Sequence, residues 1–229
     1  MRLALLIAAL LLSSVTLRAQ EPLSFEPGGA EACAKATHTP IPGPNDNSRT
    51  FGYACAERDL QIEKAQFIAL SRAIESRSPE ERLAFNALMV SFTAFREVDL
   101  NVETCHAGNS CPAYLEAGKA EFNHDFLQLV QQQTAVPPAT VDELTAADAA
   151  LNVSYEKIFA LLPPACAAAL ADCQSQPMLR DAQRAWIRYR DAWGTFGVLH
   201  SPQVTRESWL TYLTRKRTEE LKSSFHSES

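Results

Sequence analysis

The chain has 229 residues, of which 21 are Lys or Arg and 27 are Asp or Glu, giving a formal net charge of -6. An acidic chain is a poor candidate for nucleic-acid binding, which depends on neutralising phosphates with basic side chains. The length allows one sizeable domain or two small ones.

The first residues have the pattern of a secretory signal peptide. Arg2 precedes an apolar run from Leu3 to Leu12, and a more polar stretch follows up to Ala19. The apolar run is too short to span a bilayer comfortably. We expect a signal peptide over residues 1–19, and a periplasmic or secreted protein with no membrane span after cleavage. Loss of Arg2 and Arg18 would remove two positive charges and change the formal charge from -6 to -8.

After the signal, helices separated by proline-containing or glycine-containing loops are expected. Glu21 to Arg49 is rich in proline and glycine and predicts a loop. Apolar residues then recur at helical spacing, and no stretch alternates as a strand would. The predicted breaks in chain order are Gly108–Pro112, Val136–Pro138, Leu162–Pro164 followed by Pro177, and Gly194–Pro202. The fold class is therefore all-α.

Six cysteines follow the signal: Cys33, Cys55, Cys105, Cys111, Cys166 and Cys173. An even number in an exported chain favours disulfides. The spacing favours three local pairs, 33–55, 105–111 and 166–173, which would staple the helical bundle. The alternative is a zinc site formed by Cys105, His106 and Cys111, but only His124 lies nearby as a fourth ligand. We expect no metal and no cofactor.

The stretch "MLRDAQRAWIRYRDAW", residues 178–193, could be a cationic aromatic surface or a helix with its aromatic side in a core. Its apolar residues continue beyond the stretch in steps of three and four: Leu179, Ala182, Trp186, Tyr189, Trp193 and Phe196. This spacing is typical of one helix face. Arg180, Arg184 and Arg188 fall on another face, so we expect the aromatic side chains to be core.

The same steps occur 94 residues earlier, at Phe85, Leu88, Phe92, Phe95, Asp99 and Val102. Arg96 then corresponds to Arg190, but the register fails at Asp99, which corresponds to Trp193. The preceding segments correspond at an offset of 88, and each half ends in a further helical segment. We predict two related helical units in tandem, residues 20–133 with the proline-rich loop and residues 137–224. Isolated amphipathic hairpins leave an apolar stripe in water, so the units should pack together.

Several motifs resemble a known family. "CAKAT" at Cys33–Thr37, the cysteine at Cys55, "LN" and "Y" in "DAALNVSYEKI", and "AQRAWIRYRDA" resemble the bacterial lysozyme inhibitor LprI-like N-terminal domain family. The fuller set of motif residues lies in the second unit: Leu151, Asn152, Tyr155, Gln183, Trp186, Arg190 and Asp191. The resemblance implies a small exported helical domain with a binding role, including inhibition of lysozyme.

The motif residues are expected to be structural first. An arginine can bury its methylene groups and direct its donors to an acceptor on a neighbouring helix. We predict that Arg190 clamps the helical hairpin through Asn152, Asp148 or a helix-end carbonyl, with Arg96 as its counterpart.

No catalytic motif is evident. There is no "GxSxG", no glycine-rich phosphate loop and no "HExxH", and the five histidines are scattered. Glu80–Glu81 are expected to be a favourable charge near a helix start. Glu219–Glu220 and the basic cluster Arg215–Arg217 are expected to be solvated, with an anionic contact of the cluster as the alternative.

The leading hypothesis is therefore an exported, non-enzymatic binding protein that blocks lysozyme or another cell-wall hydrolase. The partner-binding candidates are the tips of two predicted disulfide loops, Asn109–Ser110 and Ala171–Asp172. Stapling of helix ends is the alternative for both loops. The second hypothesis is a structural or assembly module of the cell envelope without a hydrolase partner. An enzyme would require a deep pocket in which several ionisable side chains converge.

Overall fold

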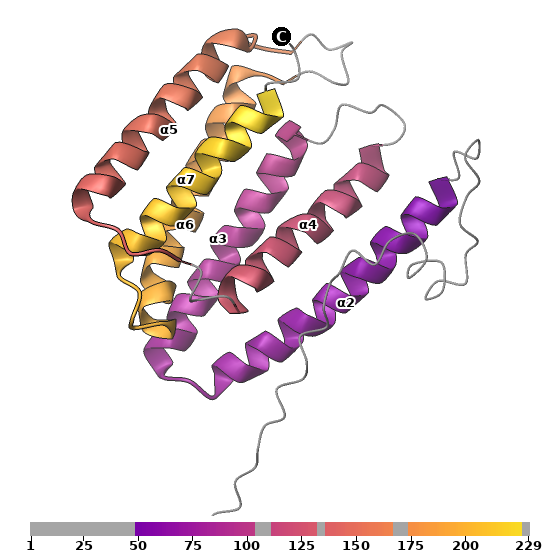
Figure 1. Ribbon diagram of the computed structural model, residues 1–229. Coiled ribbons are helices and arrows are strands. Elements are labelled where there is room, and N and C mark those ends of the chain that lie inside the picture. Colours follow the sequence, from indigo (N-terminus) through magenta and orange to yellow (C-terminus); the bar gives the residue numbers. More distant parts are fainter. Residues whose placement is uncertain (1–48, 104–110, 132–135, 167–173, 226–229) are drawn as a thin grey trace, which may run out of the picture.

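The computed structural model describes residues 49–103, 111–131, 136–166 and 174–225, which form helices and short connections (Figure 1). The helices are α2 (Arg49–Glu75), α3 (Pro79–Glu103), α4 (Cys111–Gln131), α5 (Val141–Leu161), α6 (Gln176–His200) and α7 (Arg206–Phe225). No strand occurs in these ranges, so the all-α prediction is confirmed for them.

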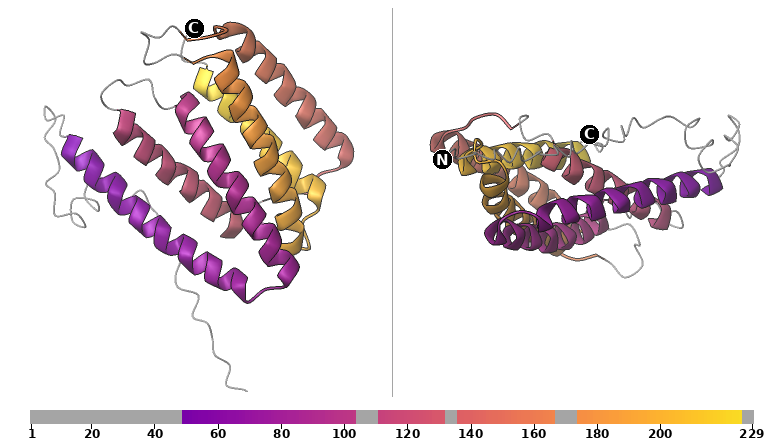
Figure 2. Two further views of the ribbon diagram at one scale, coloured as in Figure 1. Left: turned by 180° about the vertical axis from the view of Figure 1, so that it is seen from behind. Right: turned by 90° about the horizontal axis from the view of Figure 1, so that it is seen from below.

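The helices pack in the same order in both halves of the chain. In each half the first helix packs on the third, α2 on α4 and α5 on α7, while the middle helices α3 and α6 pack against each other (Figures 1 and 2). Phe85 contacts Phe196 and Phe92 contacts Tyr189, so α3 and α6 run antiparallel. This pairing places the two halves around a central helix pair.

The core crosses from one half to the other. The ring centroids of Phe85 and Phe196 are 5.5 Å apart, and those of Phe126 and Trp193 are also 5.5 Å apart. Trp193 is in addition stacked on Trp209 at 5.0 Å. Each aromatic side chain buried in this way contributes roughly 1.5–3 kcal/mol. The two predicted units therefore share a single apolar core, while their duplication and boundaries stay a prediction.

The α6 seam lies in this core, as predicted. Its six residues are at most 8% exposed: Leu179, Ala182, Trp186, Tyr189, Trp193 and Phe196. The arginines at 180, 184 and 188 are exposed on the other side of the helix. The aromatic stretch is thus a core face.

The predicted break at Gly194–Pro202 is wrong at its start, because α6 continues to His200. Both glycines of this segment are helical and buried. A Cβ on Gly197 would lie 2.5 Å from Nε1 of Trp209, and one on Gly194 would lie 3.0 Å from Cδ2 of Leu210. Gly197 is therefore required for the close approach of α7 rather than for a turn, whereas at Gly194 only the flexible end of Leu210 is in the way.

Local signals fix several of the other helix ends. Thr140 is the N-cap of α5 and forms a reciprocal capping box with Glu143. Ser78 accepts a hydrogen bond from the backbone N–H of Glu81 at the start of α3. The predicted breaks at Val136–Pro138 and Leu162–Pro164 are confirmed, since they flank α5.

The predicted signal peptide and three of the six cysteines, Cys33, Cys105 and Cys173, lie outside the described residues. Of the cysteines, only Cys55 and Cys166 have described side chains, and neither is a free thiol. The pairs 33–55, 105–111 and 166–173 therefore stay predictions, as does stapling of the bundle. Within the described ranges, none of the helices has the length and apolar character needed to cross a membrane.

Candidate functional site

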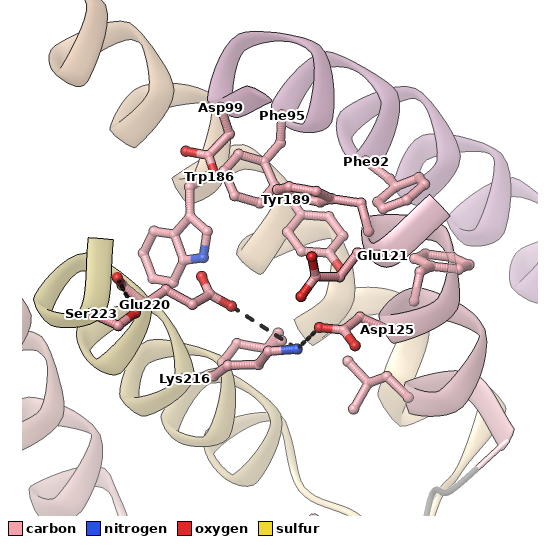
Figure 3. Close-up of a pocket in the computed structure, with 14 residues that line it drawn as sticks. Phe92, Phe95, Asp99, Glu121, Asp125, Trp186, Tyr189, Lys216, Glu220 and Ser223 are labelled. Atoms are coloured by element: carbon pink, nitrogen blue, oxygen red, sulfur yellow. Dashed lines mark hydrogen bonds and ion pairs between the residues drawn. The ribbon is translucent and has the colours of Figure 1, made fainter. Parts of the chain in front are cut away.

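A pocket of about 310 Å³ opens where the two halves meet, between α4 and α7, and side chains of the central pair α3 and α6 line its inner side (Figure 3). α4 and α7 do not pack closely on each other, in contrast to α2 with α4 or α5 with α7. The gap between them is the pocket. Its lining residues are Phe92, Phe95, Asp99, Glu121, Phe122, Asp125, Phe126, Leu129, Trp186, Tyr189, Leu213, Lys216, Glu220 and Ser223.

The inner wall of the pocket is aromatic. Phe92 and Phe95 come from α3, and Trp186 and Tyr189 from α6. These rings are largely buried, with Trp186 2% and Tyr189 8% exposed, so only their edges reach the pocket. Burial raises the pKa of Tyr189, which keeps the phenol neutral over the physiological range.

The outer wall is ionic and joins α4 to α7. Nζ of Lys216 lies 2.5 Å from Oδ2 of Asp125 and 4.0 Å from Oε1 of Glu220 (Figure 3). Burial by itself lowers the pKa of Lys216, but the hydrogen bond and negative charge of Asp125, with the charge of Glu220, outweigh burial and raise that pKa overall. Lys216 therefore stays protonated.

A buried ion pair lies at one end of the pocket. Arg217 donates to both carboxylate oxygens of Asp99, at 2.6 Å and 3.1 Å. Both side chains are 1% exposed. The expectation that the basic cluster Arg215–Arg217 is solvated is therefore wrong for Arg217, although Arg215 is exposed. The acid that interrupts the α3 seam is the partner of this arginine, because a buried guanidinium needs a neutralising carboxylate.

Negative charge remains in excess around the pocket. Four carboxylates line it, from Asp99, Glu121, Asp125 and Glu220. Lys216 lines the pocket, and Arg217 contacts Asp99 and Glu220, so two cations offset four acids. Glu121 is exposed and forms no ion pair or hydrogen bond among the described residues.

The indole N–H of Trp186 is a second group without a partner. The guanidinium of Arg190 lies over the indole ring at 5.2 Å and does not accept a hydrogen bond. Within the described residues Trp186 donates no hydrogen bond. Figure 3 shows its nitrogen facing into the pocket. The pocket thus offers a donor at its wall and a free carboxylate at its rim.

Arg190 makes one of the contacts that the sequence suggested. Its Nη1 lies 2.7 Å from Oδ1 of Asp148 on α5 and 3.5 Å from Oγ1 of Thr214 on α7. Nη2 lies 3.2 Å from Oδ1 of Asp191. The acceptor is Asp148 rather than Asn152, which is exposed. Arg190 therefore bridges three helices outside the pocket.

The predicted counterpart, Arg96, occupies a comparable position on α3. It lies over Phe92 at 5.5 Å, as Arg190 lies over Trp186, four residues before it in each case. Its Nη1 donates to Oδ1 of Asn123 on α4 at 2.7 Å. Both arginines thus cover an aromatic ring and reach a neighbouring helix.

The remaining motif residues are distributed between core and surface. Leu151 and Gln183 are buried, Tyr155 is half-buried, and Asn152 is exposed on α5. Of the motif, only Trp186 reaches the pocket. The structure does not gather the motif into one site.

Glu81 lies in the first turn of α3, as expected, but it also has a buried partner. It is 6% exposed, and its Oε1 lies 2.7 Å from Nδ1 of His200, the last residue of α6. Glu80 lies in the same turn, where hydrogen bonds from its own backbone N–H and from Ser78 lower its pKa. Glu81 and His200 join the ends of the central helices.

Other predicted site residues cannot be placed in this geometry. Asn109, Ser110, Ala171 and Asp172 lie outside the described residues, as do Cys105 and His106 of the zinc alternative. In the ranges that the structure describes, no three His, Cys, Asp or Glu side chains are grouped to hold a metal ion.

The acids and the lysine of the pocket are not evident from the sequence. Glu121, Asp125 and Lys216 lie on the predicted helical segments, but nothing in those segments indicates a shared site. One signal was visible: Asp99 falls at an apolar position of a seam, which points to a buried ionic partner. No comparable signal brings α4 and α7 together.

Comparison with known proteins finds a family similarity in the second half of the chain. Residues 128–221 match the family described as Lysozyme inhibitor LprI. No curated protein and no solved structure matches the chain. The matched region runs from the end of α4 through α5, α6 and most of α7, and does not include Cys33–Thr37 or Cys55. The sequence motifs indicate a resemblance to the LprI lysozyme inhibitor family. The match confirms this resemblance for residues 128–221.

Proposed function

We propose that this protein is an exported binding protein that inhibits a lysozyme or a related peptidoglycan hydrolase. The observation that carries the proposal is the match of residues 128–221 to the lysozyme inhibitor LprI family. The charge of the chain supports it, because a formal net charge of -6 favours association with a basic enzyme.

We propose binding rather than catalysis at the pocket. Ionisable side chains do converge there, which is the arrangement that an enzyme would require. However, Asp99 is held in a bidentate pair with Arg217, and Asp125 is hydrogen-bonded to Lys216. These two carboxylates are engaged in contacts that join helices, so we propose that they hold the pocket together rather than act on a substrate.

The first experiment measures lysozyme activity on peptidoglycan with the mature protein present at micromolar concentration. We expect inhibition that weakens as salt rises, because screening reduces association between oppositely charged surfaces. Absence of inhibition of every lysozyme class tested would contradict the proposal. The protein alone should release no reducing sugar from peptidoglycan, and release of sugar would show that it is an enzyme.

Affinity capture from an envelope extract separates this function from that of an envelope assembly module. Recovery of a hydrolase supports inhibition, whereas recovery of other envelope proteins supports assembly. N-terminal sequencing of the exported protein tests the predicted signal peptide, with a new N-terminus at Gln20 as the expected result. Mass spectrometry without reduction tests the three predicted disulfides.

A further inference from the structure

We infer that the pocket between α4 and α7 binds one basic side chain of a polypeptide partner, with its cationic group at the carboxylate rim and a carbonyl oxygen on the indole N–H of Trp186. This inference rests on the proposed function, because it names the chemistry by which a basic hydrolase would be recognised.

The rim supplies the first element of recognition. Glu121 is an exposed carboxylate without a partner among the described residues, and Glu220 is half-exposed on the facing helix. With four acids and two cations around the pocket, the unbalanced charge is negative. A guanidinium or ammonium group would restore the balance, and a planar guanidinium can donate to two carboxylates at once.

The inner wall supplies the second element. Trp186 is 2% exposed, yet its indole nitrogen faces the pocket and donates no hydrogen bond among the described residues. Among the described residues, the indole nitrogens that are buried without a partner are those of Trp193 and Trp209, whereas the nitrogen of Trp186 reaches the open pocket. The Trp186 N–H is therefore a donor to which an acceptor from outside the chain has access. A peptide segment supplies a carbonyl acceptor together with the cation. A simple metal ion or amine would leave the indole donor unused.

Lys216 occupies part of this site from within the chain. Its ammonium group lies between Asp125 on α4 and Glu220 on α7. An external cation must share these carboxylates with Lys216. Removal of the lysine charge should therefore strengthen binding, whereas removal of a rim carboxylate should weaken it.

The test uses the full mature protein and small probes, without a hydrolase. The probe is N-acetyl-arginine amide, and its control is N-acetyl-citrulline amide, which keeps the carbonyl groups and the shape but has no charge. The chain has three tryptophans, so the indole N–H signals in an NMR titration are few. Trp193 and Trp209 are fully buried away from the pocket and serve as internal references.

We expect the arginine probe to shift the Trp186 indole signal and to bind about ten-fold or more tightly than the citrulline probe. Glu121→Gln should reduce its affinity by a similar factor, and Lys216→Met should increase it. Glu156→Gln, an exposed acid on α5 that does not line the pocket, is the matched control and should change nothing. Circular dichroism of each variant checks that the fold is retained.

Equal binding of both probes, an unshifted Trp186 signal, or equal weakening by Glu121→Gln and Glu156→Gln would overturn the inference. The two proposals fail separately. If the arginine probe binds as expected but no lysozyme is inhibited, the pocket assignment holds and the proposed function is wrong. If lysozyme is inhibited equally by the parent and by Glu121→Gln, the function holds and the pocket assignment is wrong.

Discussion

Removal of the charge on Asp99 should destabilise the protein more than any other conservative change at the pocket. Asp99→Asn keeps the volume of the side chain and leaves Arg217 charged inside the core. Both side chains are 1% exposed, so no water can replace the lost carboxylate without rearrangement. Breaking a buried ion pair by removing one partner costs about 3–5 kcal/mol.

The structure places the expected cost near the lower end of that range. Nη1 of Arg217 also lies 3.4 Å from Oε2 of Glu220, which can take over part of the charge. A loss of about 3 kcal/mol in a domain of this size lowers the melting temperature by about 6–12 °C. Urea unfolding followed by circular dichroism and tryptophan fluorescence measures the change in the free energy of unfolding.

Two controls separate the charge from other effects. Asp125→Asn makes the same chemical change at a pair whose side chains are 37% and 50% exposed, and should cost less than about 1 kcal/mol. The double change Asp99→Leu with Arg217→Met replaces the pair by apolar groups and should recover most of the loss. If Asp99→Asn costs no more than Asp125→Asn, the ion pair does not stabilise the fold as described.

Three further outcomes are expected. Arg190→Ala should lower the free energy of unfolding by about 1–2 kcal/mol, because the ion pair with Asp148 and the cation–π contact with Trp186 are lost. Unchanged thermal stability together with loss of partner binding would instead show that Arg190 contacts the partner. Gly197→Ala should lower the free energy of unfolding by about 1–3 kcal/mol, because the methyl group meets the rigid indole of Trp209. Gly194→Ala should cost less, because the flexible end of Leu210 can move and a gain in helix propensity of about 1 kcal/mol offsets the strain. Equal losses for the two variants in chemical denaturation would refute the packing role of Gly197. Hydrogen bonds from the backbone and side chain of Thr140 lower the pKa of Glu143 in the folded state. Its contribution to stability is therefore present at neutral pH and is lost as the pH falls through that lowered value. Glu143→Gln should reduce the loss of stability on acidification, and an unchanged pH dependence of chemical denaturation would contradict this role.

The spacing of apolar residues is sufficient to predict the helices and their buried faces, because the seam of a helix is a local property of the sequence. The six positions of the α6 seam are all buried. Contacts between segments that are far apart in the chain could not be predicted in this way. Gly194 and Gly197 suggested a break because glycine is poor in isolated helices, but the need for space against Trp209 and Leu210 overrides that preference.

The charged residues show the same limit. Arg217 stands in a run of cations, and only its approach to Asp99, 118 positions earlier, makes it a core residue. Glu81 and His200 are likewise 119 positions apart. The pocket depends on how far α4 stands from α7, which follows from the packing of each helix on its own neighbours. Such spacing is not encoded in any one segment.

The shared aromatic core has a consequence for how the chain can be divided. Phe92 and Phe95 on α3 contact Tyr189 on α6, yet α3 precedes the region that resembles the LprI family. A fragment restricted to residues 128–221 would expose the inward side of α6 to water and should be prone to aggregate or to self-associate. The unit that folds cooperatively is therefore larger than residues 128–221, the region that matches the family. Thermal unfolding of the intact protein should follow a single sigmoidal transition.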